Sequence, residues 1–217
     1  MLNRFLDKAK KIISPQVSDV AIDPVIPVLK GYFGNRRIRV VEIGARYGDS
    51  TERILAELNV EKYIIIDPYE TYDGYGSDGF NQVLSASSDA GDLIYQRTVD
   101  RFSARPVEFI RMYSSEAASM IKDESIDLVF IDGNHRYDYV REDVISYMPK
   151  LVSGGIACGD DYFMRHDDVD FLGTLDGDYR EKMVWEAVNE CCSEMKLDVY
   201  GYGMHCGYPR AWLAVKH

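Results

Sequence analysis

Short apolar segments alternate with longer amphipathic segments along most of the chain. The apolar segments are rich in Val and Ile, which is typical of strands buried on both faces of a sheet. Several of the amphipathic segments place their apolar residues at helical spacing. The predicted strands are Ile38–Val41, Lys62–Asp67, Val107–Tyr113, Ile126–Asp132, Gly155–Gly159, Leu197–Tyr202 and Ala211–Val215. The predicted helices are Leu2–Ile13, Asp23–Phe33, Ser50–Leu58, Asp92–Phe102, Ser115–Ile121, Tyr137–Met148 and Met183–Met195.

Strands and helices that alternate in this way predict an α/β fold with right-handed crossovers and helices on both faces of the sheet. We expect a Rossmann-like, doubly wound, mainly parallel seven-stranded sheet with an antiparallel last strand. The 217 residues are enough for one such domain and short for two. Residues 1–217 are therefore expected to form a single domain with a helical cap at 1–36. The stretch 68–88 is rich in Tyr, Gly, Asp and Ser without a period and is expected to be a lid loop.

The turn after the first predicted strand carries two glycines, Gly44 and Gly48, four residues apart. Glycine lets the backbone take a positive φ and lets a ligand approach the main chain. With Glu42 at the tip of the strand and a helix opening near Ser50, the segment is typical of the first half of a nucleotide-binding βαβ unit. The middle glycine of the dinucleotide pattern G-x-G-x-x-G is absent, and a carboxylate suits a cationic ligand better than a pyrophosphate. S-adenosylmethionine, with its sulfonium and ammonium groups, fits; a tight turn without a ligand is the alternative.

Acidic residues follow several of the predicted strands. Ligands of such sheets bind beyond the carboxyl ends of the strands, so we expect these side chains to converge on one rim. They are Glu42, Asp67, Asp132, Asp160 and Asp161. Asp67 lies about 23 residues beyond Gly44, the distance at which a carboxylate takes the ribose hydroxyls of a nucleoside; a turn aspartate before Pro68 is the alternative. Ser114 would then lie beside the adenine, unless it only helps to open the next helix.

Asp132 and the pair Asp160 and Asp161 favour a metal site. Three carboxylates at one place repel one another unless a cation or protons intervene. Oxygen ligands of this kind suit Mg²⁺, Mn²⁺ or Ca²⁺, and such an ion could hold two neighbouring hydroxyls of a substrate and lower the pKa of one. In the alternative reading, Asp160 caps a loop while Asp161 faces solvent.

Two histidines are candidates for a general base. His135 follows Asp132 by three residues, in the loop above the fourth predicted strand. An imidazole that titrates near neutral pH could take the proton of an attacking hydroxyl. His205, in the loop after the sixth predicted strand, is the second candidate, and His166 in an acidic loop is expected to be a surface residue.

The charge balance limits the partners. Lysine and arginine number 25 against 36 aspartates and glutamates, a net charge of −11, which disfavours a nucleic-acid substrate. No apolar run approaches the ~20 residues that cross a bilayer, and the segment 1–13 lacks the apolar core of a signal peptide. The 4 cysteines show no C-x-x-C spacing, so we expect reduced thiols and a cytoplasmic protein without a membrane partner. The oligomeric state stays open, and a homo-oligomer is compatible with the sequence.

The chain resembles the class I S-adenosylmethionine-dependent methyltransferases, and among them the small metal-assisted O-methyltransferases of the catechol and macrolide-sugar types. The resemblance covers roughly residues 39–162. It rests on four segments in order: Val41–Thr51, Ile66–Asp67, Asp127–His135 and Gly154–Tyr162. The chain departs from the family at Arg46, where many members have glycine, and at Tyr113, where an acidic or small residue is usual. A related branch, which resembles cephalosporin hydroxylases, keeps similar motifs while a different reaction is ascribed to it.

The resemblance implies a role for each matched residue. The methionine part of the cofactor would lie against Glu42, Gly44 and Gly48, with Ala45 and Ser50 in the same site. Asp67 would hold the ribose and Ser114 the adenine region. The implied metal ligands are Asp132, Asp160 and Asp161, with Asp132 also beside the cofactor. His135 occupies the position of the catalytic base.

These observations together predict S-adenosylmethionine-dependent, Mg²⁺-assisted methyl transfer to a hydroxyl of a small molecule. A sugar, a glycoside or a phenolic diol would serve as acceptor. Catalysis would consist mostly of positioning, together with removal of one proton by His135 or by metal-bound hydroxide. Two other hypotheses remain: a non-catalytic S-adenosylmethionine-binding protein, and a hydroxylase-like enzyme on the same fold.

Overall fold

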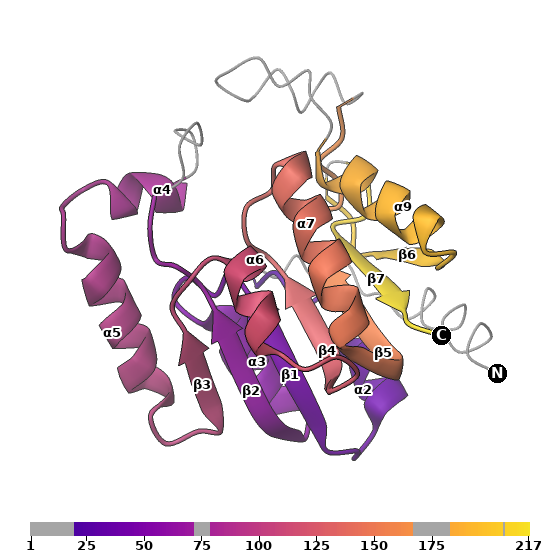
Figure 1. Ribbon diagram of the computed structural model, residues 1–217, viewed down its shortest axis with the longest axis horizontal. Helices are drawn as coiled ribbons and strands as arrows, with labels where there is room; N and C mark the ends of the chain where they lie inside the picture. The colour runs from indigo at the N-terminus through magenta and orange to yellow at the C-terminus, as the bar shows by residue number, and fades with distance from the viewer. Residues whose placement is uncertain (1–19, 72–78, 167–182, 206) are drawn as a thin grey trace.

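A seven-stranded sheet forms the centre of the protein (Figure 1). The structure is a computed structural model and describes residues 20–71, 79–166, 183–205 and 207–217. The strand order is β3-β2-β1-β4-β5-β7-β6. The strands are β1 Ile38–Ile43, β2 Val60–Ile66, β3 Val107–Ile110, β4 Ile126–Ile131, β5 Leu151–Gly159, β6 Val199–Tyr202 and β7 Ala211–Val215. Neighbours from β3 to β5 pair in parallel, whereas β7 runs antiparallel to β5 and β6. The predicted fold class is therefore confirmed.

Helices cover both faces of the sheet (Figure 1). They are α2 Ile26–Phe33, α3 Asp49–Glu57, α4 Gly79–Leu84, α5 Ala90–Phe102, α6 Ser114–Ala117, α7 Tyr137–Tyr147 and α9 Val184–Glu194. One apolar cluster joins α2 and α3 to the sheet, and a second joins α6, α7 and α9 to the opposite face. Along β1 the side chains alternate between them: Val40 packs in the first cluster and Val41 in the second. This alternation is the reason for the continuous apolar runs.

Several element boundaries differ from the predicted ones. β1 continues to Ile43, so Glu42 lies inside the strand rather than at its tip. β5 begins at Leu151, because pairing with β4 extends the strand beyond the segment of continuous burial. Within the predicted lid loop, α4 is helical, and its Leu84 packs against Tyr69 and Ile94. The predicted helix Leu2–Ile13 and part of the lid lie outside the described residues, and among the described helices none is both long and apolar enough to cross a bilayer.

An ion-pair network around the buried Asp127 of β4 joins that strand to β1 and to the segment before it. Asp127 accepts hydrogen bonds from the backbone N–H of Arg39 at 2.9 Å and from the Nε of the same residue at 3.0 Å. Arg36 donates a third hydrogen bond to Asp127 at 3.2 Å. The Asp127 side chain is only 10% exposed, so its loss removes the acceptor of the Arg39 backbone N–H and both ion pairs.

Replacing Asp127 by alanine should therefore lower the free energy of unfolding by about 2 kcal/mol, measured by urea titration. Glu61 is the matched control, because its exposed ion pair with Arg37 spans 3.8 Å and Glu61→Ala should change stability by less than about 0.5 kcal/mol. Equal effects of the two substitutions would show that the network does not stabilise the fold.

Candidate active site

The loop between β1 and α3 passes close to the end of β4. Gly44 and Gly48 have φ angles of 79° and 83°, values that favour glycine. The N–H of Gly44 donates to the carbonyl of Ile66 at 2.9 Å. A Cβ on Gly44 would lie 2.2 Å from the carbonyl oxygen of Asp132. The first predicted motif therefore lies directly against the predicted metal ligand.

Glu42 is buried beneath this loop, between β1 and α3. Its Oε2 accepts hydrogen bonds from the hydroxyls of Thr51 and Tyr63, the latter at 2.7 Å. Its Oε1 is buried and has no hydrogen-bond partner among the described residues. Burial raises the pKa of Glu42 to about 8, although both hydroxyls lower it. This oxygen is a buried acceptor whose hydrogen-bonding capacity a cationic group could satisfy.

Asp67 braces the glycine loop. Its Oδ2 accepts the backbone N–H groups of Ala45 at 3.0 Å and Arg46 at 3.1 Å, and its Oδ1 accepts that of Tyr69 at 2.8 Å. Burial nevertheless raises the pKa of Asp67. Asp67 thus makes the turn contacts of the alternative interpretation, and its binding of the ribose stays a prediction. A carboxylate has about four acceptor positions, so three bonds leave one for a ligand hydroxyl.

The other predicted cofactor residues lie in or near this loop. The side chain of Ala45 belongs to the core cluster of α2 and α3, and its carbonyl accepts the N–H of Gly48 at 2.7 Å. Ser50 is buried in the first turn of α3. Ser114 begins α6, and its carbonyl accepts a hydrogen bond from Tyr147 at 2.7 Å.

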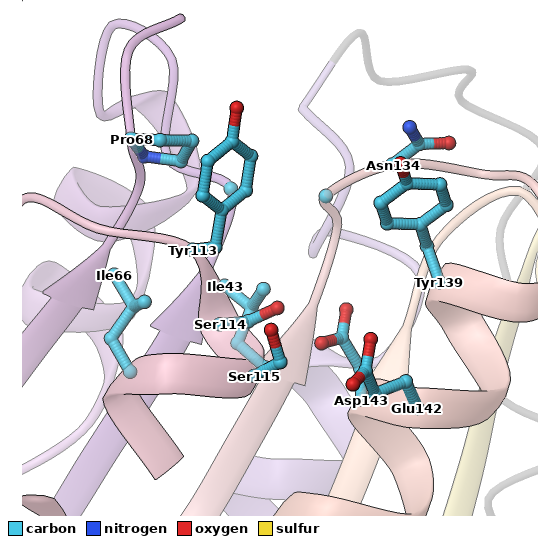
Figure 2. Close-up of a pocket in the computed structure, with 12 residues that line it drawn as sticks. Ile43, Ile66, Pro68, Tyr113, Ser114, Ser115, Asn134, Tyr139, Glu142 and Asp143 are labelled. Carbon is cyan, nitrogen blue, oxygen red and sulfur yellow. The ribbon is translucent and has the colours of Figure 1, made fainter. Parts of the chain in front are cut away.

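A pocket of about 400 Å³, counting the space that opens to solvent, lies beyond the carboxyl ends of β1, β2 and β4 (Figure 2). Ile43, Ile66 and Pro68 supply apolar surface. Polar groups come from the opposite side, among them Asn134 and Asp143. Ser114 and Gly44 also line this pocket. The pocket therefore joins two of the predicted cofactor segments.

Asp132, His135 and Asp161 converge beside the loop. His135 Nδ1 lies 3.0 Å from Asp161 Oδ2, and its Nε2 lies 3.6 Å from Asp132 Oδ1. One ligand atom from each of the three residues lies within 4.8 Å of the others. Burial lowers the pKa of His135, but the two carboxylates outweigh it and raise that pKa to about 9. In this arrangement the imidazole is charged at neutral pH and occupies the position of a cation between the carboxylates.

Asp160 forms an ion pair with Arg210, a partner that the sequence did not predict. Arg210 donates to both oxygens of its carboxylate, from Nε at 3.1 Å and from Nη2 at 3.1 Å. Burial, with Asp132 and Asp161 nearby, raises the pKa of Asp160 to about 8. His135 therefore contacts Asp132 and Asp161, whereas Asp160 pairs with Arg210. Metal ligation by Asp160 stays a prediction.

Two other histidines, His166 and His205, lie in loops and contact other partners. The ring of His205 stacks on Phe163, with centroids 4.3 Å apart. His166 is half exposed, and its Nδ1 lies 2.7 Å from the buried Glu186. Sequence reasoning missed Arg210, Asn134 and Asp143 as site residues. For Asp143 a signal existed, because Val140, Val144 and Tyr147 place it on the apolar face of α7.

Comparison with known proteins identifies the family. A family described as a methyltransferase domain matches residues 41–162, more than half of the chain. An uncharacterized protein, y4gI of Sinorhizobium fredii, is 30% identical over 120 residues, which is 52% of this chain and 12% of that protein. The chain thus spans only a small part of that curated relative.

Solved structures with the same fold include several methyltransferases. A putative caffeoyl-CoA O-methyltransferase from Staphylococcus aureus is 14% identical with a TM-score of 0.62, covering 99% of this chain and 91% of that one. A putative O-methyltransferase from Klebsiella pneumoniae is 16% identical with a TM-score of 0.55, covering 100% and 90%. The N-methyltransferase NodS from Bradyrhizobium japonicum, solved with S-adenosyl-L-homocysteine, is 12% identical with a TM-score of 0.54, covering 97% and 95%.

The chain belongs to the methyltransferase-domain family. The class of protein is that of the methyltransferases, as the resemblance predicted. The solved structures, at these low identities, add the fold alone, and O- and N-methyltransferases both share it.

Proposed function

We propose that this protein transfers the methyl group of S-adenosylmethionine to a hydroxyl of a small molecule, assisted by a divalent cation. The observation that carries the proposal is the contact between the glycine loop and the acidic cluster. Gly44 leaves no room for a Cβ against the backbone of Asp132, and the Asp132 side chain belongs to the cluster with His135 and Asp161. A donor on the loop and an acceptor at the cluster would therefore be neighbours.

The donor site has the chemistry that S-adenosylmethionine requires. The unpartnered Oε1 of Glu42 suits the ammonium group of the methionine part. The remaining acceptor position of Asp67 suits a ribose hydroxyl. The pocket lined by Ile43, Ile66 and Ser114 suits the base.

The cluster fits a divalent cation. Asp132 and Asp161 supply carboxylate oxygens, and His135 supplies an imidazole nitrogen once it has lost its proton. When bound, the ion would orient the acceptor hydroxyl and lower its pKa. Mg²⁺ is the proposed ion; an imidazole ligand would favour Mn²⁺ or Fe²⁺ over Mg²⁺, so the choice of ion depends on whether His135 or Asp160 completes the set.

The residues of this chain would contribute positioning and proton transfer. In-line transfer needs the acceptor oxygen held behind the methyl carbon, and the closeness of loop and cluster serves that alignment. Where Asp160 rather than His135 completes the set of ligands, the His135 imidazole would lose its proton as the cation binds and could then receive the hydroxyl proton. A sugar, a glycoside or a phenolic diol remains the proposed acceptor class.

The test combines ligand binding, metal binding and turnover. S-adenosyl-L-homocysteine should bind in calorimetry, and Mn²⁺ should bind in an electron paramagnetic resonance titration. Asp132→Asn and Asp161→Asn should weaken Mn²⁺ binding and lower kcat/KM for methyl transfer by at least about 100-fold. Asp49→Asn is the control, since Asp49 is exposed and pairs with Arg101.

EDTA should abolish methyl transfer from S-adenosylmethionine to a panel of sugars, glycosides and diols, and added Mg²⁺ or Mn²⁺ should restore it. Activity that is indifferent to EDTA would reject the cation. Cofactor binding without turnover on any acceptor would favour the non-catalytic alternative. The imidazole in the cluster is the observation that favours a hydroxylase-like enzyme, which Fe²⁺-dependent oxygen uptake would reveal.

A further inference from the structure

Asp143 is a buried carboxyl group for which the proposed reaction has no use. It lies on α7 and is only 3% exposed, yet it lines the pocket beyond β1, β2 and β4. In Figure 2 it comes from α7 while Ser114 and Ser115 come from α6 on the other side of the pocket floor. The Ser114 hydroxyl is its hydrogen-bonding neighbour. The two residues thus form a polar patch on the wall of a pocket to which Ile43, Ile66 and Pro68 supply apolar surface.

The surroundings of Asp143 do not balance a charge. Among the residues that the structure describes, no Lys, Arg or His forms an ion pair with Asp143. Burial, together with the neighbouring Glu142, raises its pKa to about 7 against the lowering effect of Ser114. At slightly acidic pH the carboxyl is therefore neutral, with one O–H donor and one carbonyl acceptor side by side.

A second polar group of the pocket also lacks a partner. The Nδ2 of Asn134 is buried without a hydrogen bond to any described residue, while its Oδ1 accepts the N–H of Arg136 at 3.0 Å. Buried polar groups are costly unless a hydrogen bond satisfies them. This pocket therefore suits a flat ligand with an apolar face and a hydrogen-bonding edge.

We propose that Asp143, together with Ser114, recognises the N1 and N6 edge of the donor's adenine base. The inference rests on the proposed function, because it takes S-adenosylmethionine as the donor. The neutral carboxyl donates its O–H to ring nitrogen N1 and accepts a hydrogen from the N6 amino group. Asparagine offers a similar pair of donor and acceptor, with which it binds the N6 and N7 edge of adenine in nucleic acids. Asp143 is thus a specificity-determining residue.

The experiment is a calorimetric cycle at pH 6 with two probes. One is S-adenosyl-L-homocysteine, and the other is its 1-deaza analogue, in which CH replaces N1. The wild-type protein should bind the analogue about tenfold more weakly, because one hydrogen bond is lost. Asp143→Leu should bind S-adenosyl-L-homocysteine about tenfold more weakly and should no longer distinguish the two probes. Asp143→Asn should keep most of the affinity and the discrimination, and Asp138→Asn, exposed on the same helix, should behave as wild type.

The outcomes separate the inference from the proposed function. If the wild-type protein binds S-adenosyl-L-homocysteine but Asp143→Leu still discriminates against the analogue tenfold, Asp143 does not contact the base and the inference is wrong. If the wild-type protein binds neither probe, the proposed function is wrong, and the inference, which depends on it, is wrong as well. Thermal unfolding of each variant shows whether it is folded. Should Asp143→Leu not fold, the same titrations at pH 9 carry the test, because the wild-type carboxyl has then lost its O–H donor and should no longer distinguish the probes, whereas Asp143→Asn should still distinguish them; discrimination by the wild type that is unchanged at pH 9 would overturn the inference.

Discussion

Glu42→Gln is expected to stabilise the ligand-free protein at alkaline pH and to weaken its binding of the methyl donor. Glu42 lies in β1 and is 1% exposed, and Thr51 of α3 and Tyr63 of β2 donate hydrogen bonds to one of its oxygens. Burial raises its pKa from 4.5 to about 8. Glutamine can keep the two hydroxyl contacts and has no charge to bury.

The direction of the pH effect follows from proton binding. Between pH 4.5 and about 8 the folded protein holds a proton on Glu42 that the unfolded chain has released. The stability contributed by this proton is present at low pH and is lost as the pH rises to about 8, on the order of 5 kcal/mol in all. Urea titrations should therefore show similar stabilities of the two proteins near pH 5. At pH 9 Glu42→Gln should be more stable by a few kcal/mol.

Although Glu42→Gln should gain stability at alkaline pH, it should lose affinity for the methyl donor. The ammonium group of the donor would form a charge-assisted hydrogen bond with the Oε1 of Glu42. In Glu42→Gln an amide N–H₂ at that position would face the ammonium group and repel it. The affinity for S-adenosyl-L-homocysteine should fall by at least about tenfold. Glu52→Gln on the exposed side of α3, where Glu52 pairs with Arg101, should change neither quantity appreciably. A Glu42→Gln protein less stable than wild type at pH 9 would contradict the burial argument.

The mainly parallel sheet and the rim of acids were predictable because both follow from local patterns. Val and Ile runs such as that of β4 mark a strand buried on both faces, and alternation with helices makes the sheet parallel. Once the sheet is parallel, residues directly after β1, β2, β4 and β5 meet at one edge. The convergence of Asp132 with Asp161 is therefore expected from the sequence alone.

The partners of those acids were not predictable, because tertiary contacts decide them. Arg210 is 50 residues from Asp160 and reaches it because β7 returns antiparallel beside β5. No rule of sequence spacing predicts the ion pair between Asp160 and Arg210. Likewise, spacing places Asp67 near the loop, but only the loop conformation shows that three backbone N–H groups already bind it.

Asp143 and α4 illustrate two further limits of prediction from the sequence. An acidic residue on the apolar face of α7 is visible in the sequence, but its pocket exists only where α6 and α7 meet beyond β4. The segment Gly79–Leu84 is too short for a helical period to stand out. Its helix depends on packing of Leu84 against Tyr69 and Ile94, which local propensity does not contain.

Gly44→Ala is expected to damage both folding and donor binding severely. The added Cβ would lie 2.2 Å from the Asp132 carbonyl oxygen and 2.6 Å from the Gly133 Cα, and these backbone atoms cannot rotate away. The positive φ of 79° adds strain for any L-residue. Strain and overpacking together should lower the free energy of unfolding by about 3–5 kcal/mol.

Gly34→Ala separates these two contributions. Gly34 also has a positive φ, 55°, but a Cβ there would meet nothing within 4 Å. Its alanine variant should lose only about 1–2 kcal/mol from backbone strain and should bind S-adenosyl-L-homocysteine as the wild type does. Gly44→Ala should bind at least about 100-fold more weakly wherever it remains folded, because relief of the clash moves the loop away from the Asp132 cluster. If both alanine variants lose the same stability and keep the same affinity, the contact between loop and β4 does not hold the donor site in place, and donor and acceptor positions are not coupled through Gly44.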